Sequence, residues 1–377
     1  MKPAFQIDNT QTRTEKILLL CVELPHNRDF ENQVAEAVEL VKAVNGDLLQ
    51  TVVCKRNQPH SALFVGTGKA EELAEIVAIN KIDLVIFNHE LSPTQERNLE
   101  KVLHCRVLDR VGLILAIFAQ RAKTPEAKLQ VEAAQLQHLS ARLVRGYGHL
   151  QSQKGGIGLK GPGETQLETD RRLIREKINH LNKRLAEVKK NRAVQRHNRQ
   201  RNKIPVFALV GYTNVGKSTL FNALTKSEVL VKNQLFATLD TTARRLWLSP
   251  ECTIILTDTV GFVRDLPHTL IDAFSATLEE VRHADILLHM IDISDKNYEE
   301  KADNVVQILN EIGANEVPQI KIFNKIDQLP KGQPEIFRNA QGAVCAVQIS
   351  AQNAQSLDIM RTILSEVSGS LKGKNND

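Results

Sequence analysis

Residues Gly211–Ser218 read GYTNVGKS and keep the Gly-x-x-x-x-Gly-Lys-Ser spacing of a phosphate-binding loop. The loop follows an apolar run, Val206–Val210, that predicts a buried strand, and it precedes a helical segment, Thr219–Thr225. Backbone N–H groups in such a loop surround a phosphate, and the helix dipole favours negative charge there. We expect Lys217 to neutralise the β- and γ-phosphates and the Ser218 hydroxyl to hold Mg²⁺. The alternative, a glycine turn that matches by chance, is weakened by partner motifs further along the chain.

A second motif, Asn-Lys-Ile-Asp at Asn324–Asp327, follows the apolar strand Gln319–Phe323. The Asp327 carboxylate can accept hydrogen bonds from the N1–H and the exocyclic amine of guanine. Adenine has a lone pair at N1 and no such amine, so it would leave the carboxylate unpaired. The motif therefore indicates GTP rather than ATP. A surface turn is the alternative interpretation, and the position about 110 residues after the phosphate-binding loop argues against it.

Asp-Thr-Val-Gly at Asp258–Gly261 ends another predicted strand, Thr253–Leu256. We expect Asp258 to reach Mg²⁺ through a water molecule and the Gly261 amide to face the γ-phosphate. Ser350–Ala351, after the predicted strand Ala346–Ile349, is expected to contact the guanine oxygen through its backbone.

The segment Phe236–Asp240 lies between the phosphate-binding loop and Asp258. Its Thr238 is the candidate for the second protein ligand of Mg²⁺, in a segment that orders only around the γ-phosphate. Thr241 and Thr242 are nearby rival candidates.

Together these motifs predict one site. Its nucleotide-binding residues are Gly211, Tyr212, Thr213, Asn214, Val215, Gly216, Lys217, Ser218, Phe236, Ala237, Thr238, Leu239, Asp240, Asp258, Thr259, Val260, Gly261, Asn324, Lys325, Ile326, Asp327, Ser350 and Ala351. Lys217, Thr238 and Gly261 are the predicted catalytic residues. Ser218, Thr238 and, through water, Asp258 are the predicted Mg²⁺ ligands.

The five motifs in this order resemble those of the translation-factor-related GTPases, with two departures from the most familiar small GTPases. Phe262 stands where many relatives carry a glutamine that positions water, so we expect slow intrinsic hydrolysis that needs a partner. Asn214 occupies the position of an asparagine in GTPases that use K⁺ as a charge-stabilising ion. K⁺ is therefore a possible second ion; the alternative is that Asn214 merely shapes the loop.

Composition sets the class of protein. A chain of 377 residues with 42% apolar and 25% charged residues predicts two or three globular domains. The sequence contains no apolar run of about 18 residues, so we expect no transmembrane helix. The polar segment Met1–Lys16 does not have the pattern of a secretory signal. The five cysteines are scattered without Cys-x-x-Cys spacing, which favours reduced thiols in the cytosol and no zinc site.

The net charge of +5 hides an asymmetry along the chain. Residues 121–203 contain 20 Lys and Arg against 7 Asp and Glu, a net charge of +13, so the remainder carries −8. A solvated helix face accounts for a few such charges but not for this excess, which favours a polyanionic partner. Beside a GTP site, RNA is favoured over DNA or a membrane, and the scarcity of aromatic residues predicts contact mainly with phosphates.

The N-terminal third alternates strand and helix, which predicts a small parallel α/β domain. The predicted strands are 17–22, 48–53, 62–65, 84–87 and 106–108, and the predicted helices are 32–44, 69–79 and 95–103. Gly66–Lys69 lacks the spacing of a second phosphate-binding loop and is interpreted as a turn entering a helix.

The middle of the chain predicts an antiparallel helical hairpin. One helix spans 111–121, a second 125–143, and a long one begins near Gln166, with Leu167, Ile174, Ile178, Leu181, Leu185 and Val188 in heptad spacing. A helix lying on the α/β domain is the alternative. Residues 146–163, predicted as the hairpin tip, contain seven of the 19 glycines beside several cations. Such a backbone can approach RNA closely, whereas a flexible linker is the other interpretation. The predicted RNA-binding residues are Arg145, Lys154, Gly155, Gly156, Gly158, Lys160, Gly161, Gly163, Arg171 and Arg172.

The predicted fold is therefore α/β: an N-terminal α/β domain (1–110), a basic helical hairpin with a glycine-rich loop and a linker from Arg192 (111–203), a GTPase domain (204–368) and a C-terminal tail (369–377).

Residues 155–172 (GGIGLKGPGETQLETDRR) resemble the signature of the HflX GTPases, and 128–136 (KLQVEAAQL) and 64–73 (FVGTGKAEEL) match it as well. With the GTPase motifs, the resemblance covers nearly the whole chain. It implies a cytoplasmic GTPase that binds GTP, GDP and the large ribosomal subunit and splits stalled or idle ribosomes, often under stress. We also expect a monomer that does not bind a membrane. In the family, the glycine-rich tip engages ribosomal RNA near the peptidyl-transferase region.

The resemblance further implies that GTP favours the ribosome-bound state and that hydrolysis permits release. Relatives are linked to ATP binding by the N-terminal region, but no motif here supports a second site. Some relatives also carry a longer C-terminal extension. The alternatives are a GTPase in ribosome assembly or RNA modification and a GTP-regulated RNA-binding chaperone.

Overall fold

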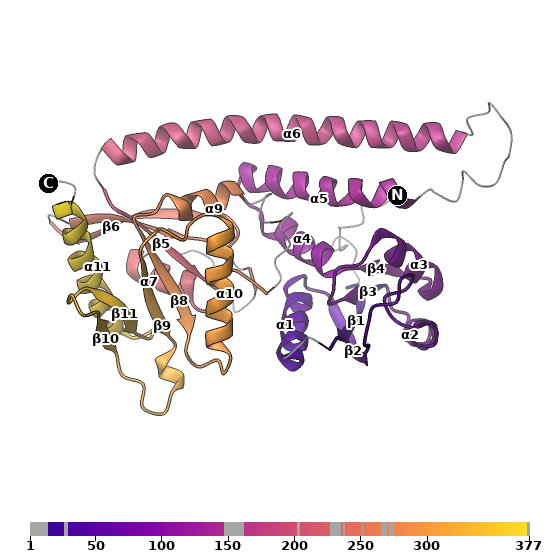
Figure 1. Cartoon of the computed structure of the whole chain (residues 1–377), viewed down its shortest axis with the longest axis horizontal. Coiled ribbons are helices and arrows are strands. Elements are labelled where there is room, and N and C mark those ends of the chain that lie inside the picture. Colours follow the sequence, from indigo (N-terminus) through magenta and orange to yellow (C-terminus); the bar gives the residue numbers. More distant parts are fainter. Residues whose placement is uncertain are drawn as a thin grey trace. The chain divides into compact units, whose positions relative to one another are not determined.

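The computed structural model describes residues 14–25, 29–146, 162–201, 204–226, 235–236, 238–250, 252–264, 270 and 275–374 (Figure 1). The chain divides into two compact units, Met1–Leu185 and Ala186–Asp377. In the described part of the chain, no helix has the length and apolar character needed to cross a membrane.

The first unit contains the predicted parallel α/β domain. Its described sheet has the strand order β2-β1-β3-β4, and every neighbouring pair is parallel. The strands are β1 (Lys16–Glu23), β2 (Asp47–Lys55), β3 (Leu84–Phe87) and β4 (Arg106–Leu108), and the helices are α1 (Phe30–Ala43), α2 (Thr67–Asn80), α3 (Pro93–Leu103) and α4 (Arg110–Arg121). The run 17–22 in β1 is fully buried, as expected for a central strand of a parallel sheet that is covered on both faces.

One predicted strand of this domain, 62–65, is wrong. The segment forms a turn closed by an isolated bridge between His60 and Phe64, with Phe64 at a positive φ of 63°. The His60 ring nitrogen Nδ1 accepts from the backbone N–H groups of Ala62 and Leu63 at 3.2 and 3.3 Å. These local bonds satisfy backbone donors that a strand would have offered to a neighbour.

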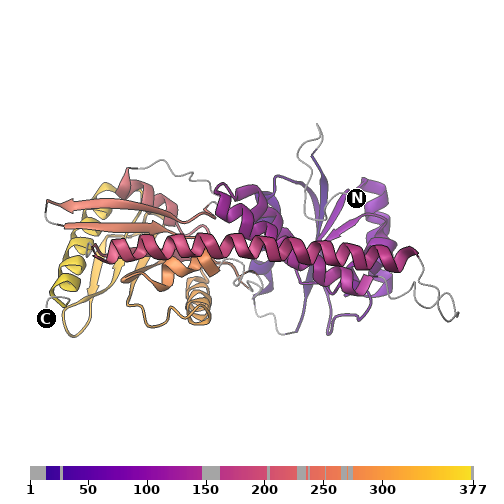
Figure 2. The same cartoon turned by 90° about the horizontal axis from the view of Figure 1, so that it is seen from above.

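The predicted antiparallel hairpin is present as α5 (Pro125–Gly146) and α6 (Pro162–Arg201), the latter a single continuous helix (Figure 2). Leu129 and Ala133 of α5 pack against Leu181 of α6, and Lys177 pairs with Glu132 at 2.7 Å. The segment from 192 that was predicted as a linker continues the helix as far as 201. Most of the glycine-rich tip, 147–161, lies outside the described residues.

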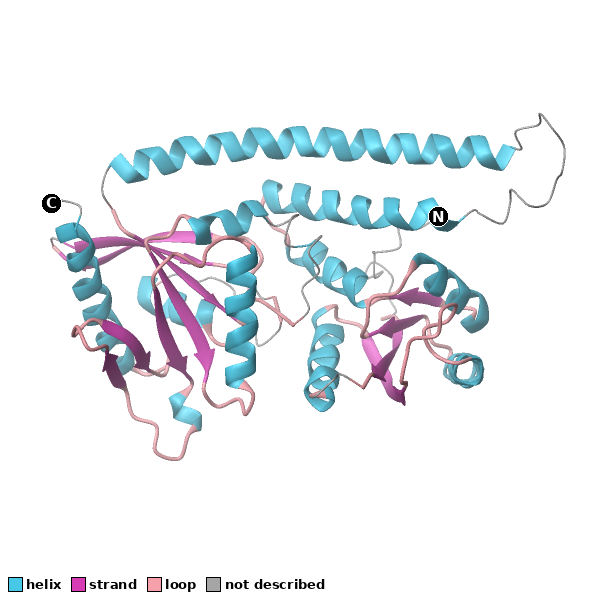
Figure 3. Cartoon of the chain, viewed as in Figure 1, coloured by secondary structure: helices cyan, strands magenta, loops and turns pink. Residues whose placement is uncertain are grey.

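The second unit is a mixed sheet with helices on both faces (Figure 3). Its described strands follow the order β10-β11-β9-β8-β5-β7-β6, with β6 and β10 antiparallel to their neighbours and the others parallel. The strands are β5 (Val206–Gly211), β6 (Thr242–Ser249), β7 (Cys252–Asp258), β8 (Ile286–Asp292), β9 (Gln319–Asn324), β10 (Glu335–Arg338) and β11 (Val344–Gln348). The helices are α7 (Lys217–Thr225), α9 (Ser275–Arg282), α10 (Tyr298–Glu311) and α11 (Ala354–Lys374), with a 3₁₀ turn η1 at Ile326–Gln328.

This topology explains why motifs far apart in the sequence meet. The predicted motifs follow the carboxyl ends of β5, β7, β9 and β11, and those ends of parallel strands lie at one edge of the sheet. At the C-terminus, α11 continues to Lys374, so the segment predicted as a tail from 369 is helical over most of its length.

Candidate functional site

The phosphate-binding loop joins β5 to α7, and its backbone conformation requires the residues found there. Asn214 and Gly216 have positive φ angles of 62° and 95°. Asparagine tolerates the left-handed region better than most residues, and glycine adopts it without a steric penalty. A Cβ atom at Gly216 would lie 2.3 Å from Nδ2 of Asn324. The glycine thus allows the loop to pass close to the guanine motif.

Lys217, the first residue of α7, is buried with its ammonium group inside the loop. Nζ donates to the carbonyl oxygens of Gly211 at 3.1 Å and Tyr212 at 2.7 Å. Burial lowers the pKa of Lys217 to about 8, against the opposing effect of the Asp258 carboxylate. A phosphate beside Nζ would favour the charged form of Lys217 and so oppose the effect of burial on its pKa.

Three oxygen-bearing side chains meet below the loop. The Ser218 hydroxyl donates to Oδ2 of Asp258 at 2.7 Å and lies 2.7 Å from the Thr238 hydroxyl, which is 3.1 Å from the same Oδ2. Asp258 is fully buried, its pKa is raised by desolvation, and its Oδ1 atom has no hydrogen-bond partner in the described structure. Two hydroxyls beside a buried carboxylate with an orphaned oxygen fit a hard cation such as Mg²⁺.

The structure therefore brings Thr238, rather than its rivals, to the other two predicted ligands. Thr242 is the first residue of β6 and is paired with Asp258 in the sheet. Ala237, also in the predicted site, lies outside the described residues.

Asn324 connects three of the motifs. Its Nδ2 donates to the carbonyl oxygen of Val215 in the phosphate-binding loop at 2.8 Å, and its Oδ1 accepts from the Ala351 backbone at 2.9 Å. Both bonds are buried, so their loss would leave unpaired polar groups. Asp327, by contrast, is exposed at the edge of the cavity and makes no ion pair with the described residues. Its carboxylate is available to a base.

The Asp258–Gly261 motif is fastened to the start of the phosphate-binding loop. The Thr213 backbone donates to the Phe262 carbonyl at 2.8 Å, and the Phe262 backbone donates to the Gly211 carbonyl at 3.1 Å. A Cβ atom at Gly261 would lie 2.7 Å from Cγ2 of Thr213, so glycine is required for this approach. The Phe262 side chain is fully buried and therefore does not reach the cavity.

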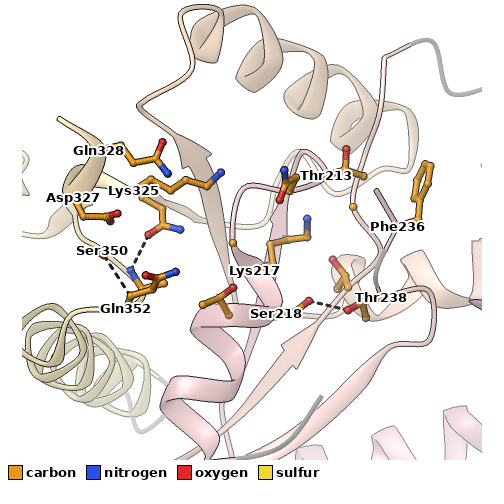
Figure 4. Close-up of a pocket in the computed structure, with 17 residues that line it drawn as sticks. Thr213, Lys217, Ser218, Phe236, Thr238, Lys325, Asp327, Gln328, Ser350 and Gln352 are labelled. Atoms are coloured by element: carbon orange, nitrogen blue, oxygen red, sulfur yellow. Dashed lines mark hydrogen bonds between the residues drawn. The ribbon is translucent and has the colours of Figure 1, made fainter. Parts of the chain in front are cut away.

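These elements enclose a cavity of about 430 Å³, within the usual range for small-molecule sites. Thr213 and Lys217 lie toward the Ser218–Thr238 end, and Lys325, Asp327 and Gln328 lie at the opposite end (Figure 4). The cavity thus has a phosphate end and a base end.

Fourteen of the predicted nucleotide-binding residues line the cavity: Thr213, Asn214, Gly216, Lys217, Ser218, Phe236, Thr238, Thr259, Gly261, Asn324, Lys325, Asp327, Ser350 and Ala351. Gly211, Tyr212, Val215, Leu239, Asp240, Asp258, Val260 and Ile326 do not line it. Three further residues that no motif marks, Thr219, Gln328 and Gln352, complete the lining. Each immediately follows a motif, which is the signal that could have found them.

Among the predicted RNA-binding residues that the structure describes, none lines this cavity. Arg171 and Arg172 lie on α6, where Arg172 is exposed and pairs with Glu176 at 3.2 Å. Arg145 and Gly163 belong to the facing ends of α5 and α6. The other six, Lys154, Gly155, Gly156, Gly158, Lys160 and Gly161, lie outside the described residues.

Three family descriptions match successive parts of the chain. Residues 31–119 match "GTP-binding GTPase N-terminal", 121–199 match "GTP-binding GTPase Middle Region", and 206–325 match "50S ribosome-binding GTPase". The matches together cover both structural units.

Individual proteins that are similar to this chain are also GTP-binding proteins. The chain is 48% identical over 352 residues to the GTPase HflX of Escherichia coli, covering 93% of this chain and 82% of the relative. It is 45% identical over 342 residues to the GTPase HflX of Caldanaerobacter subterraneus, covering 91% and 78%. Among solved structures, SsGBP in complex with GDP is similar, with a TM-score of 0.54, 25% identity and coverage of 95% of this chain and 99% of that one.

Proposed function

Because the chain belongs to the HflX family of GTPases and hydrolyses GTP, we propose that it binds the large ribosomal subunit in its GTP state and dissociates stalled or idle ribosomes in the cytosol. The single observation that carries the ribosomal part is the "50S ribosome-binding GTPase" match over 206–325, on a chain whose middle segment 121–203 has a net charge of +13.

The nucleotide part rests on the cavity. Asp327 at the base end recognises guanine, and Lys217 at the other end neutralises phosphate. Ser218 and Thr238 would hold Mg²⁺ directly and Asp258 through water. When bound, the ion would offset negative charge on the β- and γ-phosphates.

Hydrolysis requires an oriented water molecule, and the chain provides no polar side chain at the position after Gly261. Phe262 fills the core there instead. We therefore expect a slow reaction in the isolated protein and a faster one when a partner completes the site. The large ribosomal subunit is the partner we assign, and its contact with the hairpin residues Arg171 and Arg172 and with the glycine-rich tip would be mainly through phosphates.

The resulting mechanism is a switch. GTP orders Thr238 and the Gly261 segment, which favours the ribosome-bound conformation, and hydrolysis releases it. Linkage then requires that ribosome binding increase the preference of the protein for GTP over GDP by the same factor by which GTP, relative to GDP, increases its affinity for the ribosome.

The test is to mix the full chain with intact ribosomes and follow light scattering with GTP, a non-hydrolysable analogue or GDP. Scattering should fall with GTP and the analogue but not with GDP. If it does not fall, yet isolated large subunits stimulate hydrolysis, a role in ribosome assembly replaces the proposal. If large subunits bind the protein without stimulation or dissociation, an RNA-binding chaperone replaces it. If neither binding nor stimulation occurs, the ribosomal partner is wrong.

K⁺ is the second ion we propose for the site. Asn214 lines the cavity, is exposed, and its side chain has no hydrogen-bond partner among the described residues, so its amide oxygen is available to a cation. The hydrolysis rate should be higher in K⁺ than in Na⁺ at matched ionic strength. Equal rates would mean that the role of Asn214 is only conformational, to allow the positive φ angle of the loop at this position.

A further inference from the structure

The edge strand β6 presents the only tryptophan of the chain to solvent. Trp247 has 67% of its surface exposed, although β6 forms part of the sheet that carries the nucleotide site. In the described sheet β6 is a terminal strand, paired on one side with β7. Large aromatic side chains are normally buried for most of their area, so the exposure of Trp247 suggests that its side chain contacts a partner.

The neighbours of Trp247 are cationic. Because side chains alternate along a strand, Arg245 lies on the same face as Trp247, while Leu246 points to the opposite face and is 4% exposed. Arg244 and Arg245 are both exposed, and neither forms an ion pair with the described residues. No acidic residue occurs in the sequence of β6, TARRLWLS. One face of this edge strand thus combines a flat aromatic surface with the uncompensated guanidinium group of Arg245, and Arg244 adds a second exposed guanidinium group on the opposite face.

The geometry points to a second RNA-contacting surface, formed by Arg245 and Trp247 on one face of β6, in which the indole stacks on an unpaired base and the Arg245 guanidinium contacts an adjacent phosphate. Stacking on aromatic side chains together with cationic contacts to the backbone is the usual way in which proteins hold single-stranded RNA. This inference rests on the proposed function, because ribosomal RNA is the RNA it assigns.

A protein strand added to the free edge is the competing occupant. Such a partner would use the backbone groups of β6 and would have no need for an exposed indole beside an unpaired arginine on the same face. The uncompensated positive charge favours a polyanion, and the aromatic surface favours one with exposed bases.

The position of the surface also connects it to the nucleotide. Thr242, at the start of β6, is paired with Asp258, and Thr238 precedes the strand by four residues. Both Asp258 and Thr238 belong to the proposed Mg²⁺ site. The strand that carries Trp247 is therefore anchored at the end where the γ-phosphate would be sensed.

The test measures binding of the full chain to large ribosomal subunits, by co-sedimentation with the non-hydrolysable GTP analogue. Trp247→Ala should weaken binding by at least about fivefold, since stacking on one base typically contributes enough for this change. Trp247→Phe should retain most of the affinity because it keeps an aromatic face. Ile336→Ala is the matched control, since Ile336 is exposed on β10, the opposite edge strand of the same sheet, and should leave binding unchanged.

Ultraviolet crosslinking of the same complex should attach RNA to the peptide that contains β6. Affinity within twofold of the parent for Trp247→Ala, or a crosslink from β6 to a ribosomal protein, would overturn the inference while leaving the proposed function intact.

If the parent chain does not bind large subunits, the proposed function fails, and a separate experiment tests whether the β6 surface binds RNA. Trp247 is the sole tryptophan, so its fluorescence can be followed while a single-stranded oligoribonucleotide is added. Quenching that Arg245→Ala weakens would retain the surface as an RNA site, and unchanged fluorescence would remove it.

Discussion

At the scale of single residues, Lys217 holds an ammonium group in a buried position before any phosphate is bound. Burial lowers its pKa to about 8, so a substantial fraction is neutral above that pH in the nucleotide-free protein. Nucleotide phosphates favour the charged form and raise the pKa again. Binding therefore takes up a proton above about pH 8 and takes up none well below it, where the ammonium group is charged in both states.

We expect GDP affinity to be constant at pH values well below 8 and to fall as the pH rises through about 8, with a slope that approaches tenfold per pH unit. Titration with a fluorescent GDP analogue over this range measures it. Lys217→Arg should bind more weakly but without the slope near pH 8, because arginine stays charged over this range. An unchanged affinity up to about pH 9 in the parent chain would contradict the assignment.

How far single residues could be predicted from the sequence depends on whether their role is local. The phosphate-binding loop was predicted because spacing determines where positive φ angles fall, as at Gly216. The two hydrogen bonds of the Asn324 side chain, to Val215 and to Ala351, were not predicted. The first of them joins residues that are 109 positions apart in the sequence. Only the meeting of β5, β9 and β11 at one edge of the sheet creates both bonds.

At the scale of elements, Arg142 links α5 to two helices of the α/β domain of the first unit. Arg142 donates to Glu96 of α3 at 2.5 Å and to Asp109, the N-cap of α4, at 2.8 Å. Asp109 also accepts from the Gly112 backbone at 2.8 Å. Burial raises the pKa of Glu96 to about 6 despite the adjacent guanidinium, which shows how strongly this junction is desolvated.

Arg142→Ala should destabilise the first unit by about 3–5 kcal/mol, because it removes the guanidinium partner of the buried Asp109 and the half-buried Glu96. Hydrogen exchange of the full chain should show faster exchange in α3 and α5, while α10 in the second unit stays unchanged. Arg175→Ala, at an exposed position of α6, is the control and should have little effect. Equal exchange in the parent and Arg142→Ala would show that apolar packing alone holds α5.

Most elements could be predicted because their periodicity matches their burial. The heptad positions Leu181 and Leu185 do face α5, and the apolar run of β1 is central. The failure at 62–65 has a local cause, since the His60 side chain captures backbone donors that an apolar pattern cannot reveal. The helical state of residues 192–201 was not predicted because that segment has only two apolar residues, Ala193 and Val194, and so no apolar periodicity, although α6 runs through it.

At the scale of the whole molecule, charge and chemistry are separated along the chain. Residues 121–203 carry +13, whereas the remainder, which includes the nucleotide site, carries −8. The net negative charge of the remainder opposes its approach to RNA, so the basic segment provides most of the long-range attraction, and Arg245 and Trp247 on β6 make only a local contact. This division predicts that the affinity for ribosomes depends on the hairpin charges and not on the net charge of +5.

Binding to large ribosomal subunits should therefore weaken by at least about tenfold between roughly 50 and 200 mM monovalent salt, because phosphate contacts release counterions. The double variant Arg172→Gln, Arg175→Gln removes two exposed charges from α6 and should reduce the slope of log affinity against log salt by about 1 to 2. The charge-matched control Lys296→Gln, Lys331→Gln removes two exposed charges from the second unit and should leave the slope unchanged. If both double variants change the slope equally, binding would follow the total charge of the chain and not the charge of the hairpin.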